Sequence, residues 1–208
     1  MEDLLVDILE KRFGEHRVAA FLPPQHGENT IDLLKIDLEV RFPVTVIMTN
    51  GLSAYNMPVP EKKAEHSNVE LYFCLPSYWD LDDLSNPNFS WPFALLDRLS
   101  NHLLDKSTWY GVGHTFANGN PPQALSEKLK ANHLLLTEPI LLEEHLQPIV
   151  TPDKSIHFLA ITPIFEQEFD YKNSKGYFKF MRKYRSKNHN ELVDDFRQSC
   201  LKSRFRIF

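Results

Sequence analysis

Glycine is scarce in this sequence, at 7 of 208 residues. Loops that hold phosphate groups need closely spaced glycines before a helix, and Gly111–Gly113 is only a fragment of such a motif, with no third glycine and no helix after it. The segment 51–55 lacks the second glycine of a hydrolase nucleophile turn and leads toward Pro58. The sequence therefore argues against a nucleotide-binding enzyme and an α/β-hydrolase.

Cysteine and long apolar runs are also lacking. Cys74 and Cys200 do not form a paired motif, and Cys74 lies inside a strand-like run, so we expect two free structural thiols. No apolar run approaches the roughly 18 residues that span a bilayer. The acidic start, Met1–Asp3, does not resemble a secretion signal. We expect a cytoplasmic protein without a membrane span.

No catalytic or metal-binding set is evident. The chain has nine histidines, but none has the spacing of a helical metal pair or a zinc finger. Five of them fall on different predicted elements: His102, His114, His133, His145 and His157. We predict no catalytic residues, no metal and no cofactor. The competing enzyme hypothesis, a small hydrolase, requires His114 to meet the carboxylates near Asp80 in one cleft.

Composition is that of a globular protein, with 42% hydrophobic and 25% charged residues. The net charge of -5 is unevenly distributed: residues 171–208 carry eleven Lys or Arg and three acids, a charge of +8, which leaves -13 for residues 1–170. This division fits either a basic arm for an anionic partner or two surfaces that face each other within one fold. We favour the second interpretation.

Periodic patterns predict an α+β fold. Apolar residues at helical spacing predict a first helix over Glu2–Phe13, and a second is expected to begin at Trp91 with Ser90 as its cap. Alternating residues or apolar runs mark the strand-like segments 17–22, 31–41, 43–49, 68–75, 133–137 and 155–162. We expect a mixed, largely antiparallel sheet flanked by helices, in a single compact domain over residues 1–208.

The C-terminal part, residues 177–208, is predicted to be basic and helical. Its first helix has an inward stripe and a cationic outer face, the stripe being Tyr177, Phe180, Met181 and Tyr184. A short second helix, capped by Asn190, is expected to bury Leu192, Val193 and Phe196. Because the aromatic residues of the stripe belong to the core, they are not free to stack on bases, and nucleic acid is not the expected partner.

Two loops carry features of a binding surface: residues 50–60 and the aromatic loop 109–120. Large aromatic side chains on loops either contact partners or cover the core, and the sequence leaves both readings open. Our candidate partner-binding residues are His102, Trp109, Tyr110, Gly113, His114 and Phe116.

An ordered series of short motifs extends over residues 44–176. It comprises Thr49–Ser53, Met57-Pro58, Glu70-Leu71, Leu75-Pro76, Trp79, Trp91-Pro92, Gly113-His114, Leu135–Glu138, Phe158-Leu159 and Glu168. In this order the motifs resemble the suppressor of fused domain family in its bacterial, single-domain form. Gly113 differs from the animal members, which carry an aspartate before the histidine.

The resemblance implies a mixed α/β domain without catalytic activity. Animal members of the family bind a short transcription-factor peptide, which adds as a strand between two domains, and bacterial members are thought to be immunity proteins that neutralise toxins. We therefore expect a non-enzymatic protein-binding module whose partner is a toxin or a peptide segment. Its role is that of an immunity or antitoxin protein, or alternatively of a peptide-binding regulator that uses strand addition.

Overall fold

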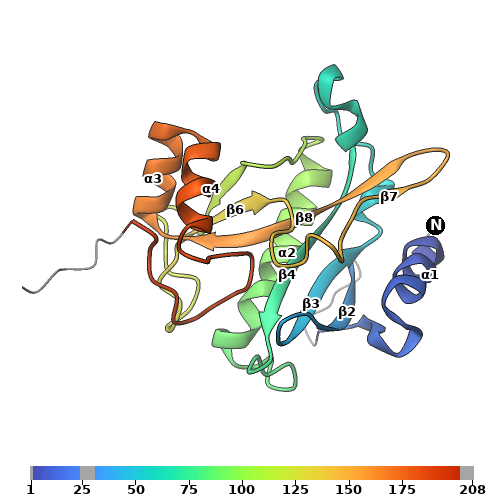
Figure 1. Cartoon of the computed structure of the whole chain (residues 1–208), viewed down its shortest axis with the longest axis horizontal. Coiled ribbons are helices and arrows are strands. Elements are labelled where there is room, and N and C mark those ends of the chain that lie inside the picture. The colour runs from blue at the N-terminus through green and yellow to red at the C-terminus, as the bar shows by residue number, and fades with distance from the viewer. Residues whose placement is uncertain (1, 24–30, 202–208) are drawn as a thin grey trace, which may run out of the picture.

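The six strand-like segments, together with two short strands that were not predicted from the sequence, form one open, mixed sheet of eight strands among the described residues (Figure 1). The computed structural model describes residues 2–23 and 31–201. The sheet order is β1-β2-β3-β4-β8-β6-β5, with β7 paired to β8, and only the β4–β8 pairing is parallel. The strands are β1 (Val18–Phe21), β2 (Asp32–Glu39), β3 (Pro43–Asn50), β4 (Asn68–Pro76), β5 (Thr115–Ala117), β6 (His133–Thr137), β7 (Ile149–Val150) and β8 (Ser155–Ile164). The predicted mixed, largely antiparallel sheet is confirmed.

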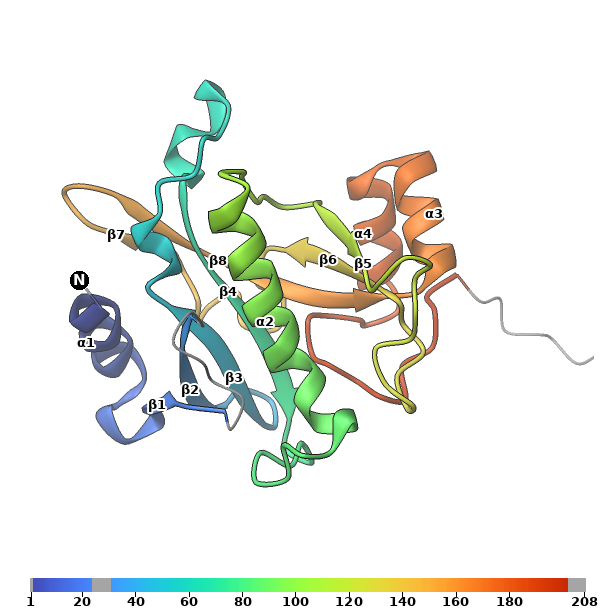
Figure 2. The ribbon, with the colours of Figure 1, turned by 180° about the vertical axis from the view of Figure 1, so that it is seen from behind.

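Helices cover both faces of this sheet. The α-helices are α1 (Glu2–Phe13), α2 (Pro87–Asp105), α3 (Glu166–Lys175) and α4 (Tyr177–Arg185), and short 3₁₀ helices are η1 (Glu15–Arg17), η2 (Leu52–Ala54) and η3 (Glu61–His66). Neighbouring residues of β4 point to opposite faces. Leu71 and Phe73 share a core cluster with α2, whereas Tyr72 and Cys74 share one with α1. Figure 2 shows α2 lying across one face of the sheet.

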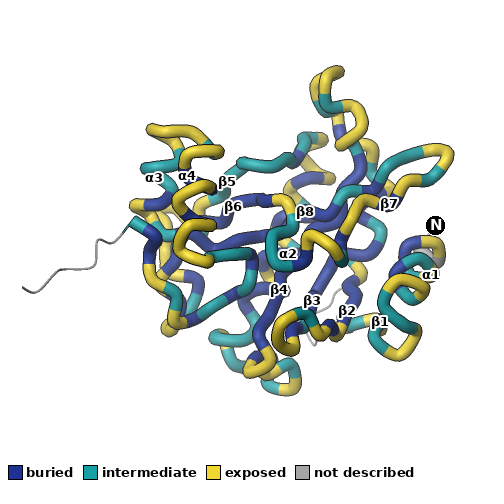
Figure 3. Tube along the Cα trace, in the orientation of Figure 1, coloured by how far each residue is buried: buried dark blue, intermediate teal, exposed yellow. Residues whose placement is uncertain are grey.

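The predicted aromatic stripe of α4 is confirmed. Phe180, Met181 and Tyr184 are buried and pack with Leu135 of β6 and Ile164 of β8. The cationic residues of α4 remain exposed, so its outer side is solvated (Figure 3). Both cysteines are free and buried, as expected. Residues 202–208 of the basic segment lie outside the described residues.

Two predicted helix details are wrong. The second helix begins at Pro87, because the Asn86 side chain accepts the N–H of Asn88 and Pro87 occupies the first helical position. Pro92 therefore lies inside the helix and does not mark its start. Residues 191–201 form no helix, since the N–H of Val193 donates to the carbonyl of Cys74 and holds the chain beside β4.

A buried carboxylate also fixes this extended C-terminal segment. Glu191 is 0% exposed and accepts the backbone N–H groups of Ile140, Leu141 and Leu142 at 2.8–3.0 Å. Three N–H donors supply the hydrogen bonds that a carboxylate buried away from water requires. The carboxylate therefore ties the C-terminal segment to the turn after β6.

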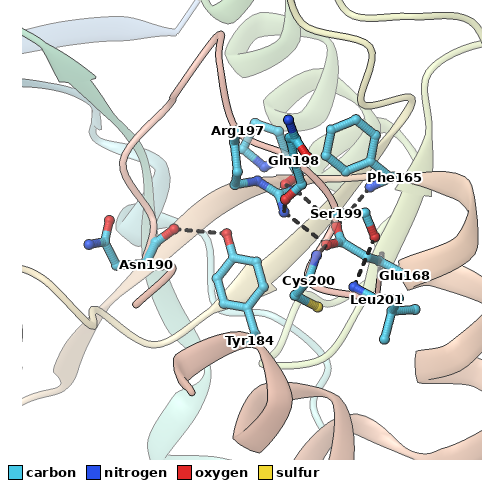
Figure 4. A network of polar contacts seen from close by, with 10 residues as sticks. Phe165, Glu168, Tyr184, Asn190, Arg197, Gln198, Ser199, Cys200 and Leu201 are labelled. Atoms are coloured by element: carbon cyan, nitrogen blue, oxygen red, sulfur yellow. Dashed lines mark hydrogen bonds and ion pairs between the residues drawn. The ribbon is translucent and has the colours of Figure 1, made fainter. Parts of the chain in front are cut away.

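An ion pair holds the end of the described chain (Figure 4). The Arg197 guanidinium donates to both oxygens of Glu168 at 2.8 and 2.9 Å, and these side chains are 5% and 0% exposed. Glu168 also accepts the N–H groups of Phe165 and Cys200. Arg197 further donates to the carbonyl of Pro163. We call these two side chains the C-terminal ion pair; they join α3 to the segment that follows α4.

Candidate functional site

The aromatic loop is positioned by the edge of the sheet. Gly113 donates its N–H to the carbonyl of Leu136 at 2.8 Å, and two residues later β5 pairs with β6. At φ +89° Gly113 has a backbone conformation that favours glycine, and a Cβ built there lies 3.4 Å from the Tyr177 ring of α4. Gly113 therefore lets the loop pass close to α4.

Trp109 lies at the centre of a small aromatic and cationic cluster. Its ring meets the His114 ring edge-on at 4.4 Å between centroids, and the Lys63 ammonium lies 5.0 Å from its centroid. A Cβ at Gly111 would stand 2.8 Å from the Trp109 ring, so only glycine leaves the ring this position. Burial, together with the charges of Lys63 and Lys172, lowers the pKa of His114 and favours its neutral form.

The side chains of Tyr110 and Phe116 pack mainly against the core. Tyr110 is 2% exposed and its hydroxyl donates to the carbonyl of Leu99 at 2.8 Å, so its side chain is not offered to a partner. Phe116 is half-buried and meets Tyr110 edge-on at 5.0 Å. His102 is exposed on α2 and stacks on Tyr110 from outside the loop. Of the six candidates, Trp109 offers the largest accessible ring.

A groove of about 720 Å³ opens beside Trp109. Segments far apart in the sequence line it: η3 and the residue Val59 before it, β4, the aromatic loop, the residues between β6 and β7, the start of β8, and α4. We call it the aromatic groove, and its lining residues include Val59, Lys62, Lys63, His66, Trp109, Val112, Glu138, Glu143, His157, Leu159, Tyr177, Phe178 and Arg185. Apolar side chains and cations therefore share one concave surface.

The charge of the aromatic groove is mixed with a cationic excess. Lys62 and Lys63 lie on the η3 side and Arg185 on the α4 side, against the carboxylates Glu138 and Glu143. Cations on both sides of an apolar surface favour an extended segment that combines apolar and acidic side chains.

Sequence reasoning missed the α4 wall of this groove. Phe178 is 85% exposed, outside the buried stripe of its own helix, and it lines the groove beside Tyr177. The sequence signal for this side of the groove is Phe178, a large aromatic residue on the cationic side of an amphipathic helix.

A larger depression of about 960 Å³ lies next to the other predicted loop. It is bounded by α1, the residues after β3 and the turn before β8, and its lining includes Asn50, Asn56, Glu65, Asp153 and Lys154. Lys154 already donates to the carbonyl of Ser53 at 2.7 Å, and this lining contains no large aromatic residue. This depression therefore lacks the aromatic anchors that line the aromatic groove.

The hydrolase hypothesis finds no support in the contacts. Asp80 accepts the backbone N–H groups of Asp82 and Asp83, whereas His114 packs on Trp109. Across residues 2–23 and 31–201, no three His, Cys, Asp or Glu side chains converge on a metal position. Over the same residues, no helix combines the length and apolar character that crossing a bilayer requires.

Comparisons with known proteins agree with the fold. A family model for the suppressor of fused protein (SUFU) matches residues 27–198. One chain of the Sufu–Fu complex crystal structure is 16% identical, with a TM-score of 0.66 over 95% of this chain and 91% of that one. Drosophila Suppressor of Fused is 17% identical, with a TM-score of 0.65 over 94% of this chain and 50% of that one. This chain thus spans half of the Drosophila protein's length.

No curated protein matches the sequence. The family model, however, covers most of the chain, and the two solved structures share its fold. The family expected from the ordered motifs is therefore confirmed: this chain belongs to the suppressor of fused family.

Proposed function

We propose that this chain is a non-enzymatic protein-binding module whose partner occupies the aromatic groove. The observation that carries the proposal is the meeting of aromatic rings and cations in one concave surface, with the partly buried Trp109 on one side and the exposed Phe178 on the other. Exposed aromatic anchors flanked by charge are typical of protein-binding surfaces. Membership of a family of regulatory protein-binding domains supports the same reading.

The free edge of the sheet suggests how the partner binds. β5 pairs with β6 on one side, and among the described strands none pairs with its other side. Residues 111 and 112 line the groove and lead into β5 within three residues. An extended partner segment can therefore add backbone hydrogen bonds to β5 while its side chains enter the groove. The similar Sufu chain was crystallised in a complex with Fu, which supports a protein partner.

The finer proposal is that the partner is a toxin and that binding neutralises it. The test is co-expression with the product of the adjacent open reading frame: growth that depends on this chain supports an immunity role. A partner that binds as an extended peptide without any effect on growth supports the regulatory alternative. Absence of both growth protection and binding would refute the proposed function.

The groove itself is tested with matched phenylalanine variants. Phe178 lies in the groove and is 85% exposed, whereas Phe196 is 77% exposed and is not among the groove residues. Removing an aromatic anchor costs about 2 kcal/mol of binding, or roughly 30-fold in Kd. We expect Phe178→Ser to weaken partner binding in calorimetry by that factor and Phe196→Ser to leave it unchanged. Equal effects of the two variants would contradict the location.

A further inference from the structure

Two histidines 91 positions apart in the sequence meet at the rim of the aromatic groove. The Nδ1 atoms of His66 and His157 lie 3.3 Å apart, and their ring centroids are 4.3 Å apart. Zinc–imidazole bonds of about 2.0–2.1 Å at a tetrahedral angle place two ligand nitrogens roughly 3.3–3.4 Å apart. The spacing of the two nitrogens is therefore that of two ligands on one ion.

The fold fixes the backbone of both histidines. His66 ends η3 one residue before β4, and His157 lies near the start of β8. The parallel pairing of β4 with β8 places Val69 opposite His157, and the buried Asn68 side chain donates to the carbonyl of Ser53. The backbone positions of the two histidines are thus set by β4 and β8 near the centre of the sheet.

Two carboxylates near the histidine pair favour a cation there, although the groove as a whole carries an excess of cations. Glu65 places a carboxylate oxygen 3.4 Å from Nε2 of His66, the ring nitrogen other than the one that meets His157. Glu138 lines the same groove and its charge acts on His157. The His66 side chain is 47% exposed, so its ring has room to turn toward an ion shared with His157.

We propose that His66 and His157 form a two-histidine site for a borderline divalent cation of the Zn²⁺ class. Two imidazoles with nearby carboxylates suit zinc or copper and not magnesium or calcium. Since no third protein ligand converges among the described residues, water fills the other coordination positions in the free protein. The bound ion bridges η3 and β8 across the groove wall. The site does not depend on the proposed partner, because the metal alone is the probe.

The experiment titrates untagged, metal-free protein with ZnCl₂ in a calorimeter and with CoCl₂ in an absorption spectrometer. We expect one equivalent of Zn²⁺ to bind, a change in the visible absorption of Co²⁺, and an unfolding midpoint that rises with zinc concentration. MgCl₂ gives none of these. His66→Gln and His157→Gln each lose zinc binding.

The matched control is His16→Gln, since His16 is an exposed histidine of η1, outside the groove. It should bind zinc like the unaltered chain. Circular dichroism establishes that the variants are folded, and exposed His66 is the position least able to disturb folding. Absence of zinc binding overturns the proposal and means that the two rings share only a proton. Zinc binding that survives in the double variant His66→Gln/His157→Gln also overturns it.

Discussion

Replacing Arg197 by methionine tests the C-terminal ion pair. Arg197→Met keeps much of the side-chain volume but removes the cation that faces Glu168 at 2.8 Å. Glu168 is 0% exposed and retains only the N–H groups of Phe165 and Cys200. Breaking one side of a buried ion pair costs about 3–5 kcal/mol, because an uncompensated charge stays buried. We expect that loss in the free energy of unfolding.

The assay is equilibrium unfolding in urea followed by tryptophan fluorescence. With a slope of about 2 kcal/mol per molar urea, the midpoint falls by roughly 2 M. Arg182→Met is the matched control, since Arg182 is an exposed arginine of α4, and it should change stability by less than about 0.5 kcal/mol. The double variant Glu168→Gln/Arg197→Met removes the buried charge and should recover at least about 1 kcal/mol over Arg197→Met.

The pH dependence gives an independent check on the same pair. Burial raises the pKa of Glu168, but the hydrogen bonds and charge of Arg197 and the two N–H donors outweigh it, so the pKa of Glu168 is lowered overall. A lowered pKa stabilises the fold above the unfolded value of about 4.3, and this stabilisation is lost as the pH falls through the folded pKa. The cost of Arg197→Met should therefore shrink in acid. A cost below about 1 kcal/mol at pH 7, or a double variant no more stable than the single one, would refute this reasoning.

Three further predictions concern the loop and the buried polar groups. Gly111→Ala places a Cβ 2.8 Å from the Trp109 ring, so near-UV circular dichroism should change and partner affinity fall; an unchanged spectrum contradicts the packing. Tyr110→Phe removes the hydrogen bond to the carbonyl of Leu99 and should cost about 0.5–1.5 kcal/mol in urea unfolding. Burial raises the pKa of Glu70. The contribution of Glu70 to stability is therefore full below a pH of about 4.3 and is lost as the pH rises through the pKa of the folded state. Glu70→Gln should reduce the loss of unfolding free energy between pH 4.5 and pH 7, measured by urea unfolding at both values.

The six longer strands could be predicted because local pattern and tertiary position agree, whereas the short strands β5 and β7 were missed. In β2, Ile36 and Leu38 are buried while Asp37 and Glu39 between them are exposed. β4 reads as a continuous strand-like run, and all nine of its residues are buried at the centre of the sheet. Side-chain alternation and strand breakers such as Pro76 indicate the bounds and the buried face of a strand from only a few residues.

Helix α3 escaped prediction because its one fully buried residue is charged. The rule that apolar residues face the core assigns Glu168 to the solvent, whereas the structure buries it completely. That burial depends on Arg197, 29 residues later, and on backbone N–H donors that only the folded chain brings together. The aromatic groove was missed for the same reason, since its walls come from segments as distant as residues 62 and 185.

Helix α4, part of the basic C-terminal segment, lines one side of the aromatic groove. α4 contributes Tyr177 and Phe178 to the lining, and its position depends on the buried stripe that includes Tyr184. The Arg197 guanidinium lies 5.2 Å from the centroid of the Tyr184 ring, so the cation that neutralises Glu168 also packs against α4. Arg197 and Glu168 thus join the basic and acidic parts of the chain, whereas the cations of α4 stay exposed.

The contacts of Arg197 with α3 and α4 link the stability of the fold to partner binding in the groove. Because Arg197 holds both α3 and α4, Arg197→Met should weaken binding in the groove as well as the fold, whereas Phe178→Ser alters an exposed ring and should weaken binding alone. Measuring urea unfolding and partner affinity on the two variants separates these effects. If Arg197→Met destabilises the fold but leaves affinity unchanged, α4 holds its place without the ion pair, and the groove depends on the aromatic stripe alone.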